Sequence, residues 1–256
     1  MGELRNNFWW RRGRYEWFTP DNSSMRYLIR KGERQDVYQP PESLYRPFAH
    51  IRDQASVLAF ANRFGWLGYK PEWLKKPDRR GARRGKMVWG EPLSLWIEQA
   101  TYMRHALALW DAAREKDPFA NVLKHINQSD DAIIYRSPDF TSVITDLGYA
   151  PWLLETIKPD DKFSAAMLCV QRLVNDNIIG MVSPRLVWNG AALEWQLVPS
   201  NLLGAMWERV TQAITENRAH KRCACCNDWF ERRSDARFCS DRCKTRAHRQ
   251  RKEKKQ

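Results

Sequence analysis

The spacing of apolar residues along the chain predicts four amphipathic helices. In each of them, hydrophobic side chains recur every three or four residues and so share one helix face. Gly65 is placed to end the first helix, and Ser200 or Asn201 to cap the last. The longest stripe contains Leu93, Trp96, Ile97, Ala100, Met103, Leu107 and Trp110. The predicted helices cover about residues 51–65, 91–116, 160–179 and 200–218.

Alternation of apolar and polar residues predicts two β-hairpins. The clearer one joins residues 185–188 to 193–198 through Asn189-Gly190, a dipeptide typical of two-residue turns. The other would join residues 25–30 to 33–38 around Lys31-Gly32. Residues 132–136 are expected to form a further short strand.

These patterns predict a mainly α protein with small β-hairpins, in the α+β class. Its 256 residues are enough for a substantial hydrophobic core. Residues 1–130 are expected to be mostly helical and to carry a basic loop at 68–90. Residues 131–220 would add helices and a hairpin and form one globule with the first part. Residues 221–256 would form a separate terminal module.

Arg104 interrupts the apolar stripe of the longest predicted helix. A buried arginine is usually paired with a carboxylate. Asp111 lies on the same side but two turns away, which is a poor reach. We therefore expect the partner of Arg104 on another element, and a functional role for this side chain is the alternative.

The formal charge of +13 is concentrated in two segments. Residues 218–256 carry a net charge of +9 and residues 70–86 a net charge of +6, which leaves the remainder close to neutral. Basic patches on a near-neutral body are typical of proteins that bind a polyanion, most often nucleic acid. Residues 8–18 interleave aromatics with arginines. We interpret them as a strand or arm that packs on the core, with base stacking as the alternative.

Five of the six cysteines fall near the C-terminus. Cys223, Cys226, Cys239 and Cys243 follow the spacing C-x2-C-x12-C-x3-C, which suits a tetrahedral zinc site. Ser240 is placed as an N-cap, so that Cys243 would lie in the first turn of a helix. Cys225 is a spare thiol or a substitute ligand, and His248 is a weaker substitute.

The competing interpretation of these cysteines is a pair of disulfides. The sequence begins with no signal peptide pattern, and it has no apolar run of the roughly 18–20 residues that a membrane helix needs. We therefore expect a cytoplasmic protein with no membrane partner, in which clustered thiols bind metal more often than they oxidise. Isolated Cys169 is expected to be a core residue.

The terminal sequence RCACCNDWF…RFCSDRCKTRAHRQR, preceded by SNLLGAMWERVTQAI, resembles bacterial CGNR-type zinc-finger proteins. In that family an ABATE-like helical domain precedes a C-terminal zinc finger, and the proteins are regarded as transcriptional regulators. The resemblance covers about residues 160–250. It implies a treble-clef-like finger in which the four cysteines bind zinc, and it matches Arg246 to the arginine of the name motif. Here Lys244-Thr245-Arg246 replaces Gly-Asn-Arg, and the first cysteine pair is tighter.

Two sets of cations are the predicted nucleic-acid contacts. One lies on a helix expected from about Ser240 to Glu253, and the other lies in the 68–90 loop. The sets are Arg242, Lys244, Arg246, Arg249, Arg251 and Lys252, and Arg79, Arg80, Arg83 and Arg84. Arg242, Arg246 and Arg249 are the candidates for base readout.

The predicted function is zinc-dependent binding of nucleic acid, with DNA favoured over RNA, by a transcriptional regulator of bacterial type. Few contacts from one finger suggest a homodimer or another protein partner. One alternative is a protein-interaction module with structural zinc. A second is a nuclease targeted by the finger, but no catalytic motif supports an enzyme.

Overall fold

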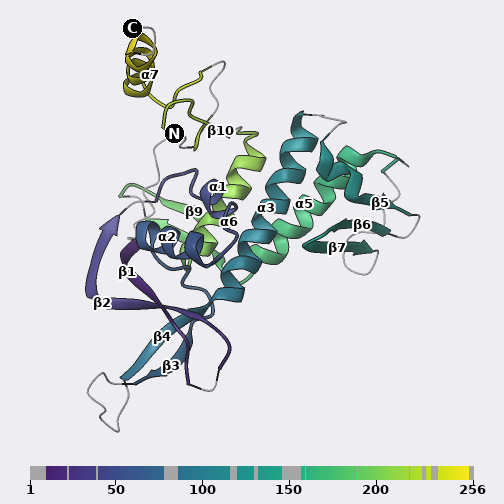
Figure 1. Ribbon diagram of the computed structural model, residues 1–256. Coiled ribbons are helices and arrows are strands. Elements are labelled where there is room, and N and C mark those ends of the chain that lie inside the picture. The colour runs from purple at the N-terminus through teal and green to yellow at the C-terminus, as the bar shows by residue number, and fades with distance from the viewer. Residues whose placement is uncertain are drawn as a thin grey trace.

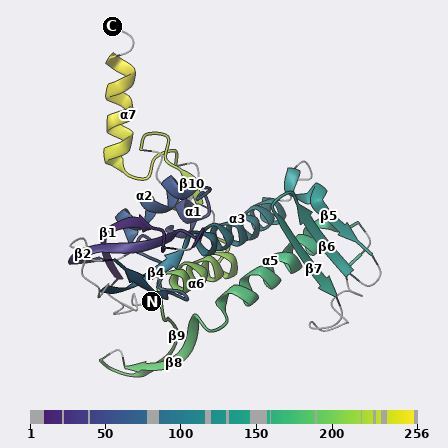
Figure 2. The same ribbon diagram turned by 60° about the horizontal axis from the view of Figure 1, so that its bottom comes forward.

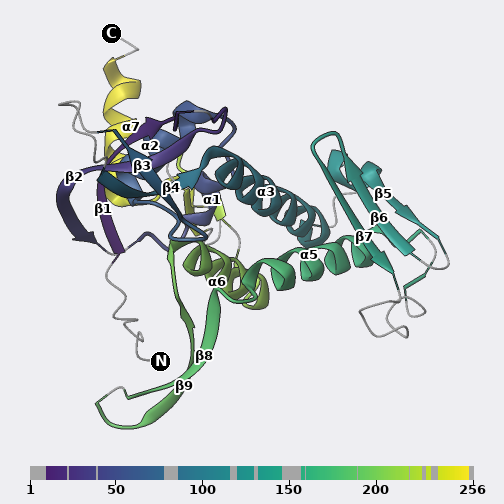
Figure 3. The same cartoon turned by 90° about the horizontal axis from the view of Figure 1, so that it is seen from below.

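The computed structural model describes residues 10–21, 23–38, 40–77, 86–115, 120–129, 132–145, 157–158, 160–188, 190–218, 220–226, 229–231 and 236–253. Side chains are described throughout these ranges except at 10–12, 33–37 and 251–253. Three long helices run through the centre of the body, with one sheet at either end (Figures 1 and 3). These helices are α3 (Leu93–Glu115), α5 (Lys162–Ile178) and α6 (Leu202–Thr215).

The predicted helices are present, and their caps explain where they begin and end. Asp161 and Asn201 accept hydrogen bonds from the backbone N–H groups of Ser164 and Gly204, at 3.1 and 2.7 Å, and so start α5 and α6. The short α1 (Tyr45–Phe48) and then α2 (Gln54–Phe64) precede α3. Gly65 ends α2 with a φ of 93°, in the left-handed region that favours glycine.

The prediction of a mainly α protein is wrong: the fold is α+β, and the described residues contain four antiparallel sheets. The largest has the strand order β1-β2-β4-β3 and comprises β1 (Trp10–Phe18), β2 (Tyr27–Tyr38), β3 (Glu72–Lys76) and β4 (Lys86–Pro92). A meander of β5 (Ile126–Gln128), β6 (Ala132–Ser137) and β7 (Phe140–Thr145) covers the far end of α3 and α5. A 3-10 helix, η1 (Asn121–His125), leads into β5.

Two local predictions are corrected in the first sheet. Residues 27–38 form one strand that pairs with β1, so the predicted hairpin around Lys31-Gly32 is wrong. Residues 68–90 are not a simple loop, because β3 and β4 pair within them from Glu72↔Gly90 to Lys76↔Lys86. The interpretation of residues 8–18 as a strand is confirmed over Trp10–Phe18, where Tyr15 is buried.

The core surrounds α3. Its side chains Trp96, Met103 and Leu109 are fully buried and join helices α1, α2, α5 and α6 in one hydrophobic cluster. Cys169 of α5 lies in the same cluster, as predicted. Because apolar burial contributes roughly 25 cal/mol per Å², this cluster is the main stabilising element of the body.

Glu91, at the end of β4, is a fully buried carboxylate. It accepts hydrogen bonds from the backbone N–H groups of Leu67 and Gly68, at 3.0 and 2.5 Å, and from the indole N–H of Trp96 at 3.0 Å. Burial raises the pKa of Glu91 to about 7, against the effect of these donors. One side chain thus ties β4, the segment after α2 and the start of α3 together.

None of the helices in the described ranges is both long enough and apolar enough to cross a membrane. The clearer predicted hairpin is confirmed as β8 (Val182–Trp188) and β9 (Leu193–Pro199), which leave the body as an arm. Figure 2 shows this arm and the C-terminal module leaving the body in different directions.

Candidate metal centre

The C-terminal module consists of a two-stranded ribbon and one helix. β10 (His220–Arg222) pairs with β11 (Trp229–Glu231), and the turn that follows β10 carries Cys223 and Cys226. Cys239 precedes α7 (Asp241–Glu253), and Cys243 lies in its first turn. The hydroxyl of Ser240 accepts a hydrogen bond from the N–H of Cys243 at 3.4 Å, which confirms Ser240 as the N-cap.

The sulfur atoms of Cys223, Cys226, Cys239 and Cys243 all lie within 4.8 Å of one another. Cys239 Sγ is 3.6 Å from Cys226 Sγ and 3.5 Å from Cys243 Sγ. Four sulfurs bound tetrahedrally at about 2.3 Å would be separated by about 3.8 Å. A disulfide bond is about 2.05 Å long, and none of the four cysteines forms a disulfide. The four thiols are therefore close enough to hold a metal ion.

The backbone around the cluster favours a thiolate. Cys223 Sγ accepts N–H groups from Cys225 at 3.5 Å and from Cys239 at 3.4 Å. Burial raises the pKa of Cys223, but the N–H groups of Cys226, Cys239 and Cys225 outweigh it and lower this pKa to about 6. Burial raises the pKa of Cys239, whose sulfur faces the other thiols. A cation at the centre of the cluster would stabilise all four as thiolates.

Cys225 and His248 do not belong to the four-sulfur group. Phe230 and Phe238 are half-buried, as expected for the small apolar core of this module. So small a core cannot stabilise the fold by itself, because short modules bury too little apolar surface. A metal ion held by the four cysteines would supply the remaining stability.

The ribbon holds the module against α1. The side chain of Tyr45 is hydrogen-bonded to Nδ1 of His220 at 3.0 Å, and the Ser43 hydroxyl donates to the carbonyl of Trp229 at 3.2 Å. The Trp229 ring also lies 5.4 Å from the guanidinium of Arg46. Arg46 is buried and is paired with Asp111 at 2.6 and 2.9 Å. These contacts fix the orientation of the module on the body.

The predicted contact residues of α7 lie on an exposed helix that stands away from the body (Figure 2). Arg242, Lys244, Arg246 and Arg249 are exposed, whereas Cys243 and Ala247 are half-buried. In the described part of the chain, none of these four cations forms an ion pair with a carboxylate. Arg251 and Lys252 belong to α7, but their side chains lie outside the described residues, as do all of Arg79, Arg80, Arg83 and Arg84.

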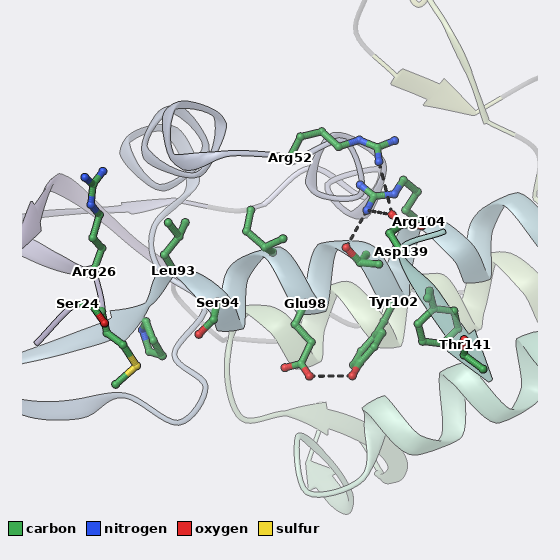
Figure 4. A pocket seen from close by; sticks show the side chains of 15 residues that line it. Ser24, Arg26, Arg52, Leu93, Ser94, Glu98, Tyr102, Arg104, Asp139 and Thr141 are labelled. Carbon is green, nitrogen blue, oxygen red and sulfur yellow. Dashed lines mark hydrogen bonds and ion pairs between the residues drawn. The ribbon is translucent and has the colours of Figure 1, made fainter. Parts of the chain in front are cut away.

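A pocket of about 1100 Å³ lies elsewhere, between α3 and the β6–β7 turn (Figure 4). Arg104 points into it and pairs at 3.3 Å with Asp139 of that turn, so its partner is on another element, as predicted. Arg52 lies 3.9 Å from the same carboxylate. The spacing in the sequence made Asp111 a poor candidate for the carboxylate that pairs with Arg104. In the structure, Asp111 forms an ion pair with Arg46 instead.

Sequence reasoning missed His105, whose Nδ1 lies 2.7 Å from the Tyr135 hydroxyl and whose Nε2 lies 3.0 Å from Asp139 Oδ1. His105 falls on the side of the helix opposite the predicted apolar stripe, so the apolar periodicity contains no signal for it. Burial lowers the pKa of His105; Asp139 opposes this, and Arg104 and Arg52 reinforce it. The lowered pKa means that the folded protein binds this proton less readily than the unfolded chain.

The stability that the neutral His105 contributes is therefore present above its ordinary pKa of 6.5 and is lost as the pH falls through the lower folded value. We expect the melting temperature of His105→Gln to fall less than that of the wild type when the pH is lowered from about 7.5 to about 5. Asp139→Asn should lose more, because it removes the carboxylate that favours the charged ring. Thermal melts at both pH values measure this, and equal losses in all three proteins would contradict it.

No protein-family model, curated protein or solved structure matches this chain. The features of this chain that indicate a function are therefore the geometry of the cysteine cluster and the charges of α7.

Proposed function

We propose that this chain is a zinc-dependent nucleic-acid-binding protein, with DNA favoured over RNA, that acts as a transcriptional regulator. The sequence resemblance to CGNR-type proteins supports the regulatory role. The single observation that carries the proposal is the exposed cationic helix α7, whose first turn contains one of the four clustered cysteines.

Zinc is the metal that best fits four thiols at tetrahedral spacing, because it has no geometric preference of its own and binds thiolate readily. Its role here would be structural. Bound by Cys223, Cys226, Cys239 and Cys243, it would join the turn after β10 to the start of α7. The direction of α7 relative to the body would then be fixed by the metal at one end of the module and by the Tyr45–His220 contact at the other.

Phosphate contacts would supply most of the affinity. The guanidinium groups of Arg242, Arg246 and Arg249 are exposed and bind no carboxylate among the described residues. They can therefore bind phosphate without first breaking an ion pair. A helix with cations on several sides can enter a groove and contact both strands, and arginines that reach base edges would provide sequence readout.

Binding should be strongly salt-dependent. Four or five phosphate contacts predict a slope of about −4 for log K against log salt concentration on DNA. Replacing Arg242, Arg246 and Arg249 together with alanine should reduce the slope to about −1 and weaken binding at least about tenfold at moderate salt. Fluorescence anisotropy with labelled random-sequence duplex DNA and single-stranded RNA measures both quantities.

A matched control loses the same charge elsewhere. Arg30, Arg63 and Lys124 are exposed on the body, and their joint replacement with alanine should leave the slope close to that of wild type. Zinc content should be unchanged in both triple variants. Wild-type protein that binds neither nucleic acid, or binds with no dependence on salt, would refute the proposal.

A further inference from the structure

The β8–β9 arm has one face made only of apolar residues. In this antiparallel pair, Pro184 lies opposite Leu197, Leu186 opposite Trp195 and Trp188 opposite Leu193. Directly opposed residues share a face, and alternate residues along each strand point to the same side. These six side chains therefore form one continuous surface, and none of them is charged.

This face is open to solvent along its whole length. Leu186, Trp188, Leu193 and Trp195 are 63%, 62%, 63% and 68% exposed, and Leu197 is 44% exposed. On the other face, Gln196 and Val198 are buried at the base of the arm. The arm thus contacts the body only at its base, and its apolar face does not contribute to the core of the body.

The area of this face is close to that of half a protein interface. Two tryptophans and three leucines at these exposures present roughly 600 Å² of largely apolar surface. Apolar patches of more than a few hundred Å² usually mark an interaction site. A stable interface buries about 800 Å² per partner. The apolar face supplies most of that area by itself.

We propose that a second copy of this chain covers the apolar face of the arm, so that two arms pack face to face in a homodimer. A face without charge can pack on its own copy and leave no ionic group buried and unpaired. In Figures 2 and 3 the arm projects clear of the helices, so two arms can meet before the two bodies do. The C-terminal module leaves the body in a different direction from the arm, so contact between two arms does not itself involve α7.

The oligomeric state of the full chain tests this directly. Sedimentation velocity and light scattering over about 1–100 μM should show a wild-type dimer, and Trp195→Asp should weaken dimerisation at least about tenfold, as expected for a central aromatic contact. Trp73→Asp is the matched control, because Trp73 is 56% exposed on β3 and lies outside the arm. A wild-type monomer throughout this range, or a dimer that Trp195→Asp leaves intact, would overturn the proposal.

A charge exchange distinguishes self-association from misfolding of the arm. Trp195→Glu and Trp195→Lys should each be monomeric alone, because like charges would meet in the dimer. Mixed in equal amounts, they should form a heterodimer, since opposite charges now face each other across the same surface. Failure of the mixture to associate, with both variants folded by circular dichroism, would also overturn the proposal. The result depends on neither zinc nor nucleic acid, so it stands apart from the function proposed for the finger.

Discussion

Replacing Cys239 with serine should abolish metal binding and unfold the C-terminal module. Cys239 Sγ lies within 3.6 Å of two other thiols, and its N–H donates to Cys223 Sγ. Metal binding to structural thiolate sites contributes about 10–16 kcal/mol at neutral pH. A hydroxyl is a poor ligand for the same ion, so most of this free energy would be lost. Purified wild-type protein should contain one zinc per chain by elemental analysis, and Cys239→Ser almost none.

The matched control is Cys225→Ser, which removes a thiol from the same turn but outside the four-sulfur group. This variant should keep its zinc and its affinity for nucleic acid. Hydrogen exchange gives a second measurement: β10, β11 and α7 should lose protection in Cys239→Ser, while α3 and α6 keep theirs. Two outcomes would show that the metal is not held by the predicted ligands. One is equal zinc content in Cys239→Ser and Cys225→Ser, and the other is loss of zinc from Cys225→Ser alone.

Glu91→Ala should strongly destabilise the body. The carboxylate accepts hydrogen bonds from Leu67, Gly68 and Trp96, and those from Leu67 and Trp96 are buried. A buried donor without an acceptor costs about 1–3 kcal/mol, so the two buried donors together cost roughly 2–6 kcal/mol, before any cavity is considered. In a chain of this size that corresponds to a fall in melting temperature of roughly 5–20 °C.

Glu98→Ala is the control for Glu91→Ala. Glu98 is an exposed residue of α3 that accepts one hydrogen bond, from the Tyr102 hydroxyl at 2.8 Å. Its replacement should change the stability by less than about 1 kcal/mol. Thermal denaturation followed by circular dichroism measures both variants. Similar melting temperatures for the two would mean that water satisfies the donors around Glu91, contrary to its complete burial.

The helices were predictable from the sequence because their signals are local. An apolar stripe such as Leu93 to Trp110, and caps such as Asn201, act within a few residues of each other. The same holds for the cysteine spacing, since C-x2-C and C-x3-C each bring two sulfurs together within one turn. The β8–β9 hairpin was predictable for a similar reason, because Asn189-Gly190 is a strong turn signal between alternating strands.

The sheets were underestimated because their pairing is not local. β2 pairs with β4 about sixty residues later, from Tyr27↔Pro92 to Ile29↔Gly90. No sequence signal near either strand identifies the other as its partner. Lys31-Gly32 looked like a turn, yet Gly32 takes its φ of 78° inside a strand that continues alongside β1. Propensity is a weak guide where the partner strand decides the conformation.

By itself, the sequence determined which segments are helical, which residues form the cysteine cluster and where the cations are concentrated. Each of these features depends on residues that are only a few positions apart in the chain. Only the tertiary structure decided that the fold is α+β, that Arg104 pairs with Asp139, that Glu91 joins three segments, and that the apolar face of the arm is left open. These features depend on contacts between residues far apart in the chain. Such contacts form only when the whole core closes, since burial and charge pairing are properties of the packed molecule.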